Sequence, residues 1–141
     1  MVIKEYYMNI PKNVIEFAKK KCLKSNMRHK LSTISYLGER IIGSGFNRMM
    51  YPCKKKQYKG IIAYSQHAES SCIYNTPRHL LKGCSVLIYR RNGLMSKPCD
   101  TCFDLLIKCG VKQISWYGRD RSITTIFITV ARENPHALAV G

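Results

Sequence analysis

The 141-residue sequence is poor in acidic side chains, and it contains no long apolar run. No stretch approaches the roughly 20 apolar residues that a membrane-spanning helix needs, so we expect no membrane partner. The opening segment MVIKEYYMNIPKN also lacks the apolar run of a secretory signal. These absences predict an intracellular protein, either cytoplasmic or nuclear.

The sequence also offers no sign of a disulfide framework. It contains seven cysteines, which is an odd number, and no export signal accompanies them. This pattern is typical of a reducing compartment, where thiols serve in packing or bind a metal.

Positive charge, in contrast, is abundant. The chain carries 24 lysine and arginine residues against 8 acidic ones, for a formal net charge of +16, and residues 1–60 hold 14 of the basic side chains. Such an excess favours a polyanionic partner such as single-stranded DNA or RNA. The alternative is that the lysine runs only solvate the surface, but Tyr51, Tyr58 and Tyr64 lie among them and could stack on bases. Seven of the basic residues are the candidate nucleic-acid contacts: Arg48, Lys54, Lys55, Lys56, Lys59, Arg90 and Arg91.

Apolar periodicity predicts one continuous domain over residues 1–141, without repeats or a linker. Helices are expected from near Asn13 and over 66–74, 78–81 and 99–109, with Gly110 ending the last of them. Strands are expected as a pair within 31–46, around a turn near Gly38, and at 84–90, 111–117 and 123–130. Residues 47–64 are predicted to form an irregular basic loop.

This order of elements predicts an α/β fold with a central mixed five-stranded sheet and helices on both faces. Only GRDRS separates the last two predicted strands. That connection is too short for the crossover that parallel neighbours require, so the two strands should form an antiparallel hairpin.

Two cysteines open a predicted helix in the segment SKPCDTC, residues 96–102. Cys99 and Cys102 are one helical turn apart, and a helix N-terminus stabilises thiolates. The pair alone fits a redox dithiol, a structural zinc site or a catalytic metal site. A second predicted helix opens with SQHAESS, in which His67 offers an imidazole and Glu69 a carboxylate. A redox dithiol leaves these two residues unexplained, and no other cysteines are paired at ligand spacing, so the pattern favours catalytic zinc.

The arrangement H-A-E followed by P-C-x-x-C matches the signature of zinc deaminases. The chain therefore resembles the cytidine/deoxycytidylate deaminase superfamily, in an arrangement similar to some viral and eukaryotic deaminase-like proteins. The resemblance extends to GSGFNR (43–48) and to residues 81–118, and it covers most of the chain. It implies a cytidine-deaminase-like three-layer sandwich and leaves a homo-oligomer open, since family members are often dimers or larger.

The resemblance also implies roles for the site residues. His67, Cys99 and Cys102 would hold Zn²⁺ together with a water molecule, and Glu69 would transfer protons during hydrolytic deamination. The residues implied to contact the sugar or the base of the substrate are Asn47, Ala68, Ser96, Pro98 and Phe46.

Several substrates agree with this metal motif. The charge favours cytosine within single-stranded DNA or RNA, which the enzyme would convert to uracil. A free nucleotide such as dCMP needs only a few phosphate-binding groups, and adenosine in tRNA shares the same motif. A non-catalytic nucleic-acid binding module is the fourth alternative, although the intact Glu69 argues against it.

Overall fold

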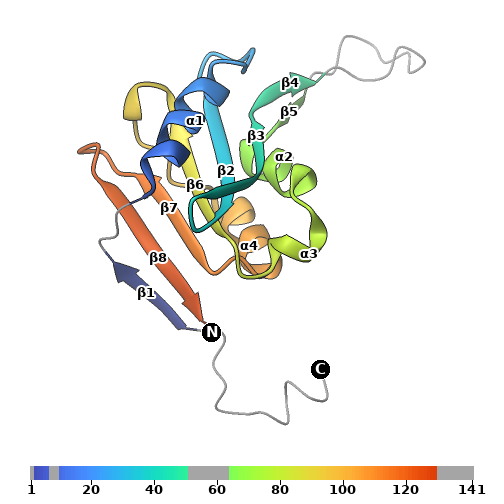
Figure 1. Ribbon diagram of the computed structural model, residues 1–141. Helices are drawn as coiled ribbons and strands as arrows, with labels where there is room; N and C mark the ends of the chain where they lie inside the picture. Colours follow the sequence, from blue (N-terminus) through green and yellow to red (C-terminus); the bar gives the residue numbers. More distant parts are fainter. Residues whose placement is uncertain (1, 7–9, 51–63, 130–141) are drawn as a thin grey trace.

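The computed structural model describes residues 2–6, 10–50 and 64–129, and its central layer is a mixed six-stranded sheet (Figure 1). The strand order is β1-β8-β7-β6-β2-β3, in which β6 and β7 are parallel and every other neighbouring pair is antiparallel. The strands are β1 (Val2–Tyr6), β2 (Leu31–Leu37), β3 (Arg40–Phe46), β6 (Ser85–Arg90), β7 (Gln113–Tyr117) and β8 (Ile123–Thr129).

Helices cover both faces of this sheet, as predicted (Figure 1). Helix α1 (Lys12–Cys22) packs on β2, β3 and β6, whereas α2 (Ala68–Asn75) packs on the same sheet beside α4 (Asp100–Lys108) on the opposite face. The short helix α3 (Arg78–Leu81) follows α2 in the chain, and the 3-10 turn η1 (Arg91–Gly93) follows β6.

Alternation along β6 divides the core into two clusters. Leu87 and Tyr89 pack with Val14 of α1, whereas Val86 and Ile88 belong to the cluster around α4. This follows from the period of two in a strand, which directs successive side chains to opposite faces. The uninterrupted apolar run in β6 is therefore what a strand buried on both faces requires.

The predicted fold class is confirmed, with one strand added. The five expected strands are present, and β7 and β8 form the expected antiparallel hairpin, closed by a hydrogen bond from Gly118 N to Ser122 O at 2.8 Å. The sixth strand is β1, which pairs with β8 along the sheet edge. The sequence analysis missed β1 because VIKEY has little pattern of its own and gains its partner only from the far end of the chain.

The prediction of an irregular loop over 47–64 is wrong at both of its ends. Strands β4 (Arg48–Met50) and β5 (Tyr64–Gln66) pair there as a separate antiparallel ribbon. Three-residue strands carry too little periodicity to be recognised, and 13 residues separate the two strands of this pair in the sequence. Residues 51–63, with Lys54, Lys55, Lys56 and Lys59, lie outside the described residues.

Helix α2 approaches the sheet closely because β3 contains two glycines. A Cβ atom at Gly45 would lie 2.6 Å from the Ser71 Cβ atom and closer still to the backbone nitrogen of Cys72. A Cβ atom at Gly43 would meet Ser35 Oγ at 2.7 Å and overlap the hydroxyl of Thr76. The two glycines of the GSG segment therefore allow α2 to pack directly on β3, and this contact sets the position of the first turn of that helix.

Within the described ranges, none of the helices has the length and apolar character needed to cross a membrane.

We expect Gly45→Ala to lower the free energy of unfolding by about 1–3 kcal/mol, because the new methyl group meets the backbone of a packed helix. Urea denaturation followed by circular dichroism measures the change. Gly118→Ala is the matched control, since its Cβ would meet the Asp120 side-chain oxygen at 3.3 Å and Ser122 O at 3.7 Å, an ordinary contact distance. Equal stability of the two variants would show that α2 is not held against β3 in this way.

Candidate metal centre

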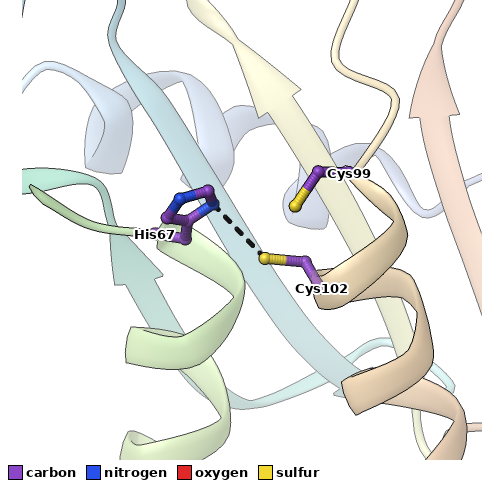
Figure 2. Close-up of side chains that lie close together, drawn as sticks. All are labelled: His67, Cys99 and Cys102. Atoms are coloured by element: carbon purple, nitrogen blue, oxygen red, sulfur yellow. Dashed lines mark hydrogen bonds between the residues drawn. The ribbon is translucent and has the colours of Figure 1, made fainter.

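Three side chains with metal-binding atoms converge between the starts of α2 and α4 (Figure 2). The ligand atoms of His67, Cys99 and Cys102 all lie within 4.8 Å of one another. Cys102 Sγ is 3.3 Å from His67 Nδ1, and Figure 2 shows the imidazole and both thiols directed toward a common point. These atoms could therefore hold one metal ion between them.

Local structure explains this convergence. His67 is the N-cap residue of α2, directly after β5, and Cys99 is the N-cap residue of α4. Cys102 lies one turn further, and the hydrogen bond from Phe103 N to Cys99 O closes that first turn at 2.8 Å. Because both helices begin at the site, their positive dipole ends meet there and favour thiolate ligands.

The segment that leads into α4 is fixed by Ser96. Its hydroxyl donates to Ile88 O of β6 at 2.7 Å and accepts from Tyr117 N of β7 at 2.8 Å. Its own backbone nitrogen donates to Tyr117 O at 2.9 Å. Ser96 is thus buried where the two parallel strands end, and it holds the chain three residues before the first thiol.

Burial differs among the chemical groups of the site. Cys102 and Glu69 are each only 4% exposed, whereas His67 and Cys99 are exposed. Burial raises the pKa of the Cys102 thiol, and the negative charge of Glu69 raises it further. Burial also raises the pKa of Glu69, while hydrogen bonds from its own backbone and from Cys102, and the charge of His67, lower it in part. A metal ion that binds here would take the place of the Cys102 proton.

A pocket of about 320 Å³ opens beside the three ligand atoms. It is lined by residues that the sequence analysis had singled out, namely Asn47, His67, Ala68, Glu69, Pro98 and Cys99. A volume of this size is at the small end of ligand pockets, which suits a single base with its sugar.

Asn47 lines this pocket and also braces its wall. Its Oδ1 accepts a hydrogen bond from Leu31 N at 2.8 Å, and its Nδ2 donates to His29 O at 2.6 Å. An amide nitrogen carries two hydrogens, so one remains for a ligand. The contact of Asn47 with a sugar stays a prediction.

Other predicted residues lie away from the pocket lining. Ser96 is buried behind the lining, with its hydroxyl engaged as described. The Phe46 ring has the ammonium of Lys21 at 5.6 Å from its centroid and is not part of the pocket wall. Arg90 is the last residue of β6, with its guanidinium 2.8 Å from His29 Nδ1, and Arg91 follows it.

The sequence analysis missed five lining residues: Met27, Leu31, Ser65, Gln66 and Lys97. Gln66 is held by a hydrogen bond from Arg48 Nε at 3.0 Å, across the β4–β5 ribbon. Lys97 stands between two residues that had been singled out, so its position in SKPC was a usable signal. Met27 and Leu31 come from a segment without any motif, and only the fold brings them to the site.

Comparison with known proteins bears on the fold. No protein-family model matches the chain, and no curated protein matches it. Among solved structures, the chain is similar to the apo form of the dCMP deaminase from the cyanophage S-TIM5, with 17% identity and a TM-score of 0.52. The match covers 74% of this chain and 79% of that one. The chain has the cytidine deaminase-like fold. The predicted superfamily resemblance is thus confirmed at the level of the fold.

Two further structures are similar with lower scores. The same dCMP deaminase in complex with dCMP and dUMP has 16% identity and a TM-score of 0.46, over 73% of this chain and 74% of that one. RibD of Acinetobacter baumannii, form 2, has 18% identity and a TM-score of 0.42, over 73% of this chain and 25% of that one.

We expect the purified deaminase-fold protein to contain about one metal ion per chain, because three ligands converge at one point. Cys102→Ala should lose this metal, since it removes the buried thiol. Cys109→Ala should retain it, because Cys109 is at the opposite end of α4. Elemental analysis by mass spectrometry, combined with circular dichroism, measures both metal and folding. A fully folded wild-type protein that takes up no metal would contradict the assignment.

Proposed function

We propose that the protein is a zinc-dependent hydrolytic deaminase that converts cytosine to uracil. One observation carries this proposal: the ligand atoms of His67, Cys99 and Cys102 converge beside the buried carboxyl of Glu69, at the wall of a pocket. The cytidine deaminase-like fold supports it.

The donor set fits zinc. One imidazole and two thiols are borderline-to-soft ligands of the kind that zinc prefers. Among the described residues, no further histidine, cysteine or acidic side chain adds a fourth ligand to this group. Three protein ligands leave one coordination position for water, which is the arrangement of catalytic rather than structural zinc sites.

Zinc held here would lower the pKa of a bound water molecule to about 7. The Glu69 carboxylate would take one proton from that water and deliver it to the ring nitrogen of the base. It would then take the second proton from the added hydroxyl and deliver it to the amino group, which leaves as ammonia. Its burial at the pocket wall keeps the carboxyl next to the reacting atoms and away from bulk water. Asn47, Ala68 and Pro98 would position the base and sugar from the other lining positions.

We favour cytosine within single-stranded DNA or RNA as the substrate. The net charge of +16 supports a polyanion, and basic side chains stand near the pocket. Lys97 lines it, and Arg48 holds the lining residue Gln66. Free dCMP is the second candidate, which the fold match to a dCMP deaminase supports.

Glu69→Gln should lower turnover by roughly 10²–10⁴-fold, because the amide cannot transfer the protons. Metal content should stay at the wild-type level, since Glu69 is not one of the three ligands. Conversion of cytosine to uracil is followed by mass spectrometry alongside elemental analysis. Wild-type turnover in Glu69→Gln would refute the proton-transfer role.

The polynucleotide substrate predicts a strong salt dependence. Affinity for a single-stranded oligonucleotide should fall steeply between low and physiological salt, because bound counterions are released from neutralised phosphates. Fluorescence anisotropy across a salt series measures this. Turnover of dCMP without oligonucleotide binding, even at low salt, would assign the protein to free nucleotides instead.

A further inference from the structure

We propose that Lys97 forms a phosphate subsite at the mouth of the pocket. The enzyme therefore prefers a cytosine nucleotide, free or within a strand, to the nucleoside. This inference rests on the proposed function. It concerns which part of the substrate is recognised, and it assigns that recognition to a side chain that the metal chemistry does not use.

Lys97 is the cationic side chain of the pocket lining that is not a metal ligand. The other lining side chains are the candidate ligands His67 and Cys99, the buried carboxyl of Glu69, and uncharged groups. Lys97 itself is exposed. Within the ranges that the structure describes, its ammonium has no hydrogen bond and no ion pair. Its charge is therefore available to a ligand.

The backbone on both sides of Lys97 is fixed. Ser96 is tied to β6 and β7 by three hydrogen bonds of 2.7–2.9 Å. Pro98 is buried, with a ring that restricts its own φ, and Cys99 opens α4. The stem of Lys97 therefore starts from a constant position next to the metal centre, and only its four-carbon chain adjusts to the ligand.

The chemistry of the substrate identifies what this charge would meet. Cytosine and its sugar are neutral, so phosphate is the anionic group of a cytosine nucleotide. A lysine ammonium is a compact charge that binds phosphate well. The phosphate could belong to a free nucleotide or to the backbone of a strand, and both offer the same oxygen acceptors.

Steady-state kinetics on three substrates test this subsite: dCMP, deoxycytidine and a single-stranded oligonucleotide with one cytosine. Lys97→Gln should raise KM for the phosphate-bearing substrate by roughly 10- to 100-fold, with kcat nearly unchanged, because a charge-assisted hydrogen bond is lost. Values for deoxycytidine should stay within about twofold. Lys97→Arg should recover most of the lost affinity, since it restores the charge.

Lys108→Gln is the matched control. It also removes one lysine charge, but at the end of α4 opposite the metal centre. Its kinetics should equal those of the wild type, and all variants should carry the wild-type amount of zinc.

The substrate arms separate the sources of phosphate. A KM effect on dCMP assigns the subsite to a free nucleotide, and an effect on the oligonucleotide alone assigns it to a strand. Equal loss for dCMP and deoxycytidine would overturn the subsite, as would wild-type kinetics of Lys97→Gln on every substrate.

Absence of activity on every one of the three substrates would refute the proposed function. The subsite could then still be tested by binding. The subsite then predicts that dCMP raises the melting temperature of the wild type more than deoxycytidine does, and that Lys97→Gln removes this difference. Equal shifts with both compounds would refute the subsite.

Discussion

The approach of two helix N-termini to one point is the constraint on which the rest of this structure depends. Helix α2 can reach that point because Gly43 and Gly45 leave β3 without side chains beneath it. Helix α4 reaches it because it connects the parallel strands β6 and β7, so that it begins at the carboxyl end of β6. Ser96 fixes the entry into α4 by bonding to both strands. The His67 imidazole therefore lies close to the Cys99 and Cys102 thiols, and the helix dipoles favour the metal-binding forms of these groups.

Side-chain amides that bind backbone groups hold the pocket next to this centre. Asn47 ties the segment before β2 to the end of β3, and Asn26 accepts a hydrogen bond from Met49 N at 2.8 Å and so ties the same segment to β4. These bonds keep Met27 and Leu31 in the pocket wall. The amides that satisfy these backbone groups thereby shape the space in which a base would lie. Asn47 serves this positioning task whatever ligand the pocket takes.

The sequence predicted the parts of the molecule that depend on local chemistry. Proline and cysteine at the start of a helix, and histidine followed by glutamate at the start of another, indicated the candidate metal centre, and uninterrupted apolar residues indicated β6. Contacts between residues far apart in the chain were not predictable in this way. The strand β1 depends on β8, the ribbon β4–β5 depends on pairing across the 13 residues between its strands, and Met27 and Leu31 reach the pocket only through the fold. Short elements are determined by tertiary contacts rather than by their own periodicity.

The central claim is that the metal centre is a zinc site with three protein ligands and one open position. X-ray absorption spectroscopy at the zinc edge of the purified 141-residue protein tests it most directly. The account predicts two sulfur ligands at about 2.3 Å and two lighter ligands at about 2.0–2.1 Å, of which one is the His67 imidazole. Addition of dCMP or of a single-stranded oligonucleotide should perturb only the lighter shell. Four sulfur ligands, or a folded protein that binds no zinc, would contradict the account.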